Sequence, residues 1–374
     1  MVEEKTLTDL PHKILETAAK AGIEASGEGR SGSLFHLNQE TVYSAINREF
    51  EGRVEVMDTK EALRKYGWLS DYLWRAVKAD ADEYTRKVAE EYSGGYFMRV
   101  FEGAEVDFPL QSCLMIARKG LEQRIHNIII AEPGSKARII SGCIVEEDIG
   151  GGSHLGISEF YVKESATLNF TMIHNWDENM TVRPRSAAIV EAGGSFISNY
   201  ICLRPVRDLQ MYPKATCLGR GSRARFNSII YGVGGSAINV GSMIDLQGEG
   251  SSGEITSRVI AKDKASVTAP GRLLGNNAGV KAHMECRGLL LDDGASIHAI
   301  PELYSNRKDV EMSHEAAVGR IADKEINYLM SRGLPRDEAT SLIVRGFLDV
   351  DILGLPPKLK AEVDGIVDSL VEGM

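Results

Sequence analysis

The sequence lacks any run of apolar residues that approaches the length of about 18 needed to span a membrane, and its first residues, MVEEKTLTDLPHK, contain no apolar signal-peptide core. It also lacks an excess of basic residues. Its 53 acidic and 43 basic side chains give a net charge of -10, which argues against non-specific binding to nucleic acid or to an anionic membrane. We therefore expect a soluble, cytoplasmic protein with neither of these partners.

A phosphate-binding loop of the GxxxxGK[ST] type is absent as well. The glycine-rich stretch GVGGSAINVG, at 232–241, has no Lys and no following helix, so we interpret it as a corner between strands. Any ATP hydrolysis linked to this chain would have to come from a partner.

Cysteines are few, and their pattern excludes two classes of protein. The five cysteines are an odd number without short paired spacings, which argues against a disulfide framework. No CxxC occurs, so neither a zinc ribbon nor a ferredoxin-like cluster motif is present. We expect free thiols at positions 113, 143, 202, 217 and 286.

Residues 7–92 have a helical texture. Apolar residues at helical spacing predict a first helix that ends near Gly22, and residues 24–36 are predicted to be a loop. Further helices are predicted over 59–67 and 80–92. The sequence assigns no function to this region beyond packing or interaction.

From about Gly94, short segments rich in Ile, Val, Phe and Tyr alternate with turn residues. A turn followed by a small residue recurs at intervals of 29, 28, 30, 41 and 30 residues, at Ala137, Ala166, Gly194, Ala224, Ala265 and Ala295. A fixed period without helices is typical of a solenoid, and the long interval fits either an insertion or an extra half-turn. A β-sandwich is the competing fold, but its turns recur every 8–12 residues.

After Gly319 the pattern returns to helix, with predicted helices over 321–332, 336–347 and 357–371. A solenoid needs its ends covered, and the terminal helical segments are suited to that. The fold class is therefore mainly β. We predict a helical region over 1–93, a β-helix core over 94–310 and a helical region over 311–374.

The most reactive side chains stand near the end of the predicted core. Cys286, His314 and Glu315 supply a thiol, an imidazole and a carboxylate, which are ligands of borderline transition metals. Their spacing of 28 residues would place Cys286 and His314 on neighbouring turns, about 5 Å apart in the stacking direction. The alternative is an inert buried Cys and a His that caps the next helix.

A family resemblance rests on several short motifs in a specific order. They are VDFPLQSCLMIARKG at 105–119, SGC at 141–143, HNW at 174–176, MECRGLLLDDGASIHAIPEL, SHEAAVGRI and INYLMSRGLPRDEATSLIVRGFL. Over residues 100–350 the chain resembles SufB and SufD, the paired scaffold proteins of the SUF system for iron–sulfur cluster assembly.

The resemblance implies a right-handed parallel β-helix and a C-terminal helical region that binds the ATPase SufC. It implies that Cys286, His314 and Glu315 lie where two subunits meet and hold a nascent, transient iron–sulfur cluster, so the chain would be a scaffold rather than an enzyme. SHEAAVG combines features of SufB and SufD, so the partner could be a second copy of the chain or a paralogue. Flavin binding stays open.

Cys143 matches the SufB cysteine thought to accept sulfur from a donor protein. It precedes Cys286 by 143 residues, about five turns or ~24 Å, and the spacings of 31 and 28 put Cys143, His174 and Cys202 in nearly one column. His174 stands where SufB has Gln, in the HNW motif that continues with Asn175 and Trp176.

Other positions weaken the resemblance or carry no assigned role. Met115 and Ala117 replace polar residues of SufB, which puts an internal route for sulfur in doubt. Cys113 and Cys217 are expected to be structural, and His283 either supports Cys286 or faces solvent.

Two other functions remain open. A structural adaptor would position the ATPase without holding a cluster. A carbohydrate-active β-helix enzyme would need clustered charges on one sheet face and usually a secretion signal, which this sequence lacks.

Overall fold

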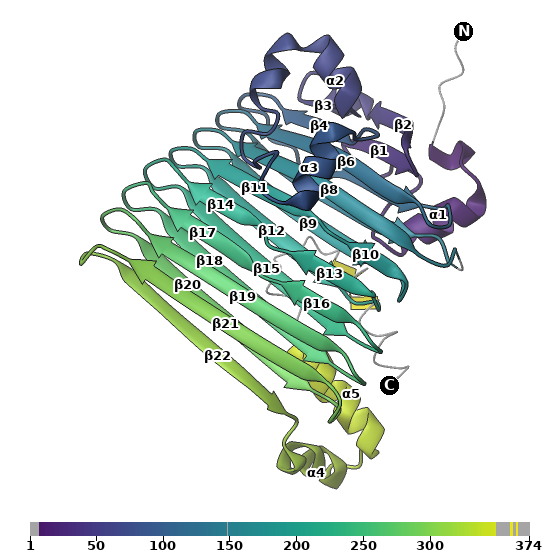
Figure 1. The fold of residues 1–374 in the computed structure, drawn as a ribbon, viewed down its shortest axis with the longest axis vertical. Helices are drawn as coiled ribbons and strands as arrows, with labels where there is room; N and C mark the ends of the chain where they lie inside the picture. The colour runs from purple at the N-terminus through teal and green to yellow at the C-terminus, as the bar shows by residue number, and fades with distance from the viewer. Residues whose placement is uncertain (1–6, 148, 349–359, 362–363, 366–374) are drawn as a thin grey trace.

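The computed structural model describes residues 7–147, 149–348, 360–361 and 364–365 of the chain. Its strands stack into a parallel solenoid of about eight turns, with short helices near the two ends of the chain (Figure 1). The solenoid predicted from the repeat is confirmed, as is the parallel arrangement of strands that the family resemblance implies. None of the described helices is long and apolar enough to cross a membrane.

Two sheets form the walls of the solenoid. Within the described residues, sheet A contains, in spatial order, β2 (Glu40–Ile46), β1 (Gly32–Leu37), β5 (Leu110–Ile116), β7 (Lys136–Val145), β9 (Thr167–Asn175), β12 (Ser195–Cys202), β15 (Arg223–Gly232), β18 (Ser252–Ala261), β20 (Lys281–Leu290) and β22 (Glu311–Arg320). Sheet B contains β10 (Met180–Val182), β13 (Asp208–Met211), β16 (Ala237–Val240), β19 (Ser266–Gly275), β17 (Ser242–Leu246), β14 (Lys214–Cys217), β11 (Arg185–Val190), β8 (Gly152–Val162), β6 (Glu122–Ala131), β4 (Tyr96–Val100) and β3 (Val54–Asp58), with β21 (Ser296–Ser305) on β19.

One corner of the solenoid repeats the same backbone conformation on successive turns. A residue with φ between 58° and 68° stands there each time, and its N–H donates to a carbonyl of the next turn, as Gly134 does to Glu164 at 2.9 Å. Glycine adopts this left-handed conformation without strain. Six of the seven positions are therefore Gly, and the exception is Ser165; the glycines are Gly103, Gly134, Gly193, Gly221, Gly250 and Gly279.

The interval of 41 residues in the predicted repeat is an extra half-turn. The turn before Ala224 leads into β15 of sheet A, whereas the turn before Ala265 leads into β19 of sheet B. The sequence pattern therefore marks two different corners of one coil. The glycine-rich stretch 232–241 contains the corner between β15 and β16, as expected.

Side chains that alternate along the strands fill the interior with one continuous apolar core. Aromatic rings from successive turns contact each other: the centroid of Phe160 lies 4.7 Å from that of Phe170 and 5.0 Å from that of Phe196. Phe196 in turn lies 6.1 Å from Phe226. The stacked core explains why the strands are rich in apolar residues although each is short.

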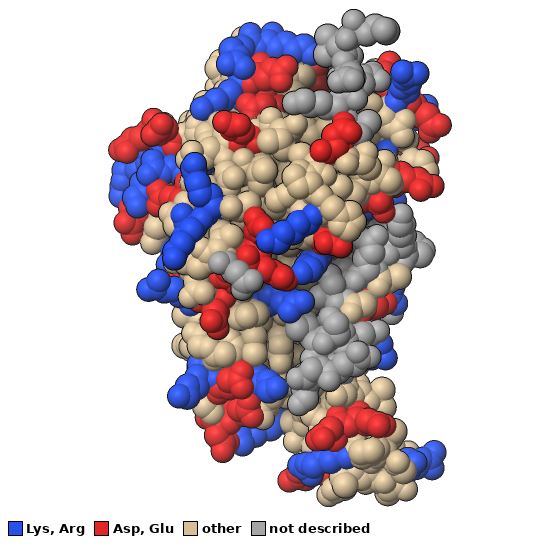
Figure 2. Space-filling view, turned by 90° about the vertical axis from the view of Figure 1, so that its right-hand side faces the viewer, with Lys and Arg blue, Asp and Glu red and all other residues tan. Residues whose placement is uncertain are grey.

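Ion pairs connect neighbouring turns on the outer surface. Examples are Arg225–Glu254 at 2.6 Å and Arg272–Glu302 at 2.7 Å. On the face shown in Figure 2, basic and acidic side chains are accordingly interspersed. Such exposed pairs each contribute about 0–1 kcal/mol, so most of the stability comes from the core.

Strands rather than helices close the N-terminal end of the solenoid. β1 pairs with β5 in parallel and with β2 antiparallel, and β3 pairs antiparallel with β4. The interior is filled there by Leu34, Phe50 and Val54, all at most 5% exposed.

The prediction that residues 7–92 are helical is therefore wrong for β1–β3, and the predicted loop 24–36 overlaps β1. The segment GSLFHL forms a strand because both of its faces are buried. Leu34 joins the interior, while Phe35 packs with apolar residues of the N-terminal segment that covers sheet A from outside. The division at residue 94 stays a prediction, although strands of both sheets lie before it.

The remaining N-terminal segments are helices that lie outside the sheets. η1 (Leu7–Asp9) and α1 (His12–Ala19) contribute to the cluster on sheet A, whereas η2 (Arg48–Phe50) packs into the end of the interior. On the outer face of sheet B lie α2 (Thr59–Lys65), η3 (Gly67–Asp71) and α3 (Glu83–Glu90). The three predicted helices correspond to α1, α2 and α3.

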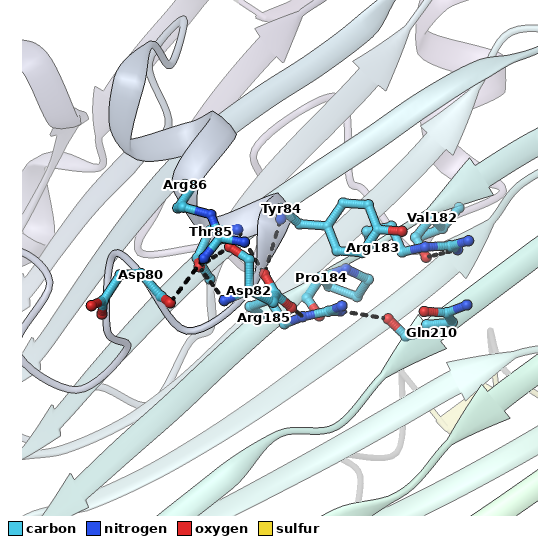
Figure 3. A network of polar contacts seen from close by, with 10 residues as sticks. All are labelled: Asp80, Asp82, Tyr84, Thr85, Arg86, Val182, Arg183, Pro184, Arg185 and Gln210. Atoms are coloured by element: carbon cyan, nitrogen blue, oxygen red, sulfur yellow. Dashed lines mark hydrogen bonds and ion pairs between the residues drawn. The ribbon is translucent and has the colours of Figure 1, made fainter.

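A capped helix start and two arginines hold α3 against sheet B (Figure 3). Asp82 caps the helix through the N–H groups of Tyr84 and Thr85, and its carboxylate also receives a hydrogen bond of 2.5 Å from Arg185 Nε. The ring of Tyr84 faces the guanidinium groups of Arg183 and Arg185, at 5.4 and 5.0 Å. These contacts fix the position of the helix on the solenoid wall.

The C-terminal end is built differently. β22 is the last strand of sheet A, and β21 pairs only with β19 among the described strands. Every residue of β22 except the half-buried Met312 is exposed. The predicted helical region 311–374 thus begins with a strand, because this stretch extends the ladder of β20 by one more turn.

Two helices follow this strand, α4 (Asp323–Ser331) and α5 (Arg336–Phe347), as predicted. Val344 of α5, together with Leu348, joins the cluster on the outer face of sheet A. The helix predicted over 357–371 lies largely outside the described residues.

Candidate functional site

Cys286 and the pair His314–Glu315 lie on neighbouring strands, but their register differs from the one expected. Cys286 on β20 is paired with Ala316 on β22, whereas His314 is paired with Met284 and Glu315 with Glu285. The period at this end is therefore 30 residues, not 28, and Cys286 and His314 are diagonal neighbours. One step between strands and two along the strand put their Cα atoms about 8 Å apart.

The two sides of the strands separate the three predicted ligands. Paired residues of parallel strands point to the same side, and successive residues alternate. Cys286 and His314 therefore share the inner side, while Glu315 points to the outer side with Glu285. His314 and Glu315 are exposed, whereas Cys286 is 5% exposed. The chain alone brings a thiol and an imidazole together, without the carboxylate.

Charged groups surround the outer side of β20 next to Cys286. Glu285 forms ion pairs with Arg258 at 3.0 Å and with Arg287 at 2.5 Å. Burial raises the pKa of the Cys286 thiol, against the opposing influence of the Arg258 charge and a hydrogen bond with Ser257. In the folded chain the thiol thus keeps its proton near neutral pH.

No three His, Cys, Asp or Glu side chains are grouped so that they could hold a metal ion within the part of the chain that the structure describes. A cluster held by Cys286 would need ligands from outside a single chain. This agrees with the expectation of a site shared between subunits, which itself stays a prediction.

The predicted column of Cys143, His174 and Cys202 is confirmed. Cys143 is paired with His174, and His174 with Cys202, on three successive strands of sheet A. All three side chains face the interior and are at most 2% exposed. Burial raises the pKa of Cys143 to about 12 and that of Cys202 to about 11.

Five steps of strand pairing separate β7, with Cys143, from β20, with Cys286, as the repeat predicted. An interior cavity of about 60 Å³ covers part of this path. Five of its lining residues form one column on successive strands: Met172, Tyr200, Ser228, Ser257 and Cys286. The cavity reaches Cys286 but is not lined by Cys143.

A cluster of buried polar rings adjoins Cys143. His174 Nδ1 lies 2.9 Å from the Tyr200 hydroxyl, and the rings of His154 and Trp176 lie 6.4 and 5.5 Å from that of His174. The pKa of His174 is lowered well below its usual value, mainly by burial. His174 Nε2 and Trp176 Nε1 have no hydrogen-bond partner among the described residues.

Cys113, Cys217 and His283, which have no assigned role, lie on different sides of the solenoid wall. Cys113 and Cys217 are buried with apolar neighbours, Cys113 on the outer side of sheet A and Cys217 in the interior. His283 is half-buried on the outer side of β20 and bonds to Ser313 at 2.8 Å. It therefore points away from Cys286.

Several polar interior residues escaped the sequence analysis. Gln123 bonds His154 Nδ1 at 2.9 Å, and Tyr200 bonds His174. Sequence spacing could have revealed Gln123, because it precedes His154 by one period of 31 residues. It could not have revealed Tyr200. Met284 could have been found from strand alternation, because it stands two residues before Cys286 on the same side.

Residues 115–347, more than half of the chain, match the family model described as "SUF system FeS cluster assembly, SufBD core domain". A protein of Methanothermobacter thermautotrophicus named as an iron–sulfur cluster assembly SufBD family protein is 44% identical over 370 residues, covering 98% of this chain and 90% of the relative. Relatives with the same family name in Archaeoglobus fulgidus and Pyrococcus horikoshii are 47% and 31% identical, covering 93% and 99% of this chain and 92% and 83% of their own lengths. The chain therefore belongs to the SufBD family of iron–sulfur cluster assembly proteins.

Proposed function

We propose that this protein is a scaffold subunit on which a nascent iron–sulfur cluster is built where the C-terminal end of its solenoid meets a second subunit. The cluster is the cargo of this reaction and leaves for a recipient. Cys286 supplies a sulfur ligand and His314 an exchangeable one, a combination suited to temporary binding. Glu315, on the outer side of the same strand, would ligate only if the contact with the second subunit changes its surroundings.

The observation that carries this proposal is the open edge beside Cys286. β22 offers backbone N–H and C=O groups without a partner strand among the described residues, and such an edge favours pairing with another chain. Tyr304 on β21 and Val318 on β22 add apolar side chains that are 58% and 42% exposed. The partner is a second copy of this chain or a SufB/SufD paralogue.

Sulfur would enter at Cys143 from a donor protein and travel along the interior toward Cys286. The raised pKa of the Cys143 thiol means that a base must accept its proton before it can attack a persulfide. His174 is its register neighbour and has an unpartnered Nε2, so it can accept a hydrogen bond from the thiol, while the thiolate that leaves the donor takes the proton. The column of Ser228 and Ser257 then provides hydroxyl groups along the cavity to Cys286.

The C-terminal helices are the expected contact with a SufC-type ATPase. Tyr328 and Met330 on α4 and Leu342 on α5 are 62%, 41% and 49% exposed. Large apolar side chains concentrated on two short helices are typical of a surface that binds another protein.

Anaerobic reconstitution with iron and sulfide tests the role of Cys286. We expect Cys286→Ala to lose the bound iron, the sulfide and the visible absorption, while Cys217→Ala keeps them. Both cysteines are buried, so matched urea midpoints would show that the difference is not a folding defect. Iron and sulfide retained by Cys286→Ala would refute the proposed site.

Co-purification with the ATPase separates the scaffold from a structural adaptor. A scaffold binds the ATPase and holds iron and sulfide. A complex that forms with full stoichiometry but never carries iron would replace our proposal with the adaptor.

A further inference from the structure

We propose that Met284 and Cys286 form a binding site for a soft monovalent cation, copper(I), inside the last complete turn of the solenoid. This site shares Cys286 with the proposed cluster site but takes a different ion, and it does not rest on the proposed function. Thiolate and thioether sulfurs together select copper(I) over the harder divalent metals.

The positions of the two sulfur-bearing side chains support a shared site. Met284 and Cys286 stand two residues apart on β20, so both point to the inner side, with their Cα atoms about 6.6 Å apart along the strand. Both line the interior cavity of about 60 Å³, and they are 2% and 5% exposed. The flexible thioether of Met can adjust its position to share an ion with the neighbouring thiol.

A glycine on the opposite wall makes room for the thioether. A Cβ atom at Gly271, on β19, would lie only 2.6 Å from Met284 Sδ. The sulfur thus occupies the space that a side chain at position 271 would take. Any larger residue there would displace the thioether without removing a ligand.

The site lies one strand inside the open end. His314 and Ala316, the register partners of Met284 and Cys286, are exposed on β22. An ion can therefore reach the two sulfurs by passing the short side chain of Ala316 and the polar side chain of His314. The His314 imidazole is its first contact. On binding, the Cys286 thiol gives its proton to solvent and the copper remains in the +1 state, so no electron is transferred.

The test is an anaerobic titration of the full-length chain with copper(I) against a chromogenic chelator, with silver(I) as a redox-inert probe. We expect one ion per chain for the wild type, a loss of binding in Cys286→Ser, and at least a tenfold weaker affinity in Met284→Leu. Met172→Leu is the matched control. Met172 lines the same cavity four strands away, about 19 Å from Cys286, and this variant should bind as the wild type does.

A second variant guards against a folding effect of Met284→Leu. Gly271→Ala leaves both sulfurs in the chain and should also weaken binding, by displacing Met284. Equal affinities of Met284→Leu and Met172→Leu, or copper binding that survives Cys286→Ser, would overturn the proposal. Iron and sulfide retained by Met284→Leu would keep this result separate from the outcome for cluster assembly.

Discussion

The two ends of the solenoid differ in how far their strands are buried. At the N-terminal end, antiparallel strands and buried side chains close the interior; five of the six residues of β1 are buried, and so are four of the five of β3. At the C-terminal end, no residue of β21 or β22 is fully buried. One end is closed by strands of the chain itself, whereas β22 at the other end has no further partner strand among the described residues.

We base the proposed function on this difference. A free sheet edge is a liability for a soluble protein, and proteins normally cover or blunt it. This chain ends its sheets with the antiparallel strands β2 and β3 on one side and with the exposed strand β22, next to Cys286, on the other. The predictions below test this contrast, beginning with the largest expected effect.

Truncating an inner-side residue should be costly on β1 at the closed end but not on the exposed strand β22. Leu34→Ala removes a side chain that is 2% exposed, and we expect a loss of about 3 kcal/mol in the free energy of unfolding. Val318→Ala, on the exposed strand β22, should change it by less than ~0.5 kcal/mol. Urea unfolding of the two variants measures both values, and equal losses would contradict the contrast.

Acid should destabilise the protein through the buried histidines of the closed half. Burial lowers the pKa of His36 to about 4 and that of His154 to about 3, whereas an unfolded histidine titrates near 6.5. Below pH ~6.5 the unfolded chain therefore binds more protons than the folded one, so stability falls as the pH decreases toward these values. Each group contributes up to ~1.4 kcal/mol per pH unit.

The matched variants for this prediction are His154→Gln and His12→Gln. Urea midpoints between pH 7.5 and 4.5 should depend less on pH in His154→Gln, whose amide can keep a hydrogen bond to Gln123. His12 has a side chain that is 86% exposed, so its variant should follow the wild type. A wild-type slope in His154→Gln would show that this histidine does not cause the acid sensitivity.

A charge on the open edge should weaken association between subunits. We expect Val318→Lys to raise the dissociation constant of the assembly at least tenfold, because a Lys on an exposed edge opposes strand pairing. Leu218→Lys, at an apolar position on a corner that is 52% exposed, serves as control. Sedimentation measurements that show no difference between these variants would exclude β22 from the interface.

The smallest expected effect is on the stability of a corner. The corners have the same backbone conformation toward both ends of the solenoid. Ser165 adopts a left-handed φ of 58° in a series otherwise made of glycine. Ser165→Gly should raise the free energy of unfolding by about 1 kcal/mol, and Gly193→Ser should lower it by a similar amount. A loss of stability in Ser165→Gly, read from the urea midpoint, would mean that the Ser side chain contributes more than its strain costs.

The corners and strand periodicity were predictable from sequence because they depend on local rules. Glycine at positive φ and alternation along strands recur at each turn, so the solenoid and even the column of Cys143, His174 and Cys202 could be derived. The strands β1–β3 could not, because GSLFHL becomes a strand only through burial on both faces by residues distant in sequence.

The relative positions of the candidate site residues were less predictable from sequence than the fold. A change of two residues in the period near the end of the chain moved His314 from Cys286 to Met284, and strand alternation then placed Glu315 on the opposite side. Periodicity fixes a column only if the corners keep their length, and the corner between β20 and β21 (291–295) is one residue longer than the corner between β18 and β19 (262–265). The bond between Tyr200 and His174 joins residues that are not register partners on neighbouring strands, so the repeat does not report it.

The most direct test of the central claim is to measure mass and cluster content on the same particle. Light scattering on the anaerobically reconstituted protein, combined with iron and sulfide analysis of each fraction, should find the cluster only in particles of two subunits. The monomer favoured by Val318→Lys should carry none. A cluster bound with full stoichiometry to a single chain would contradict assembly between two open ends.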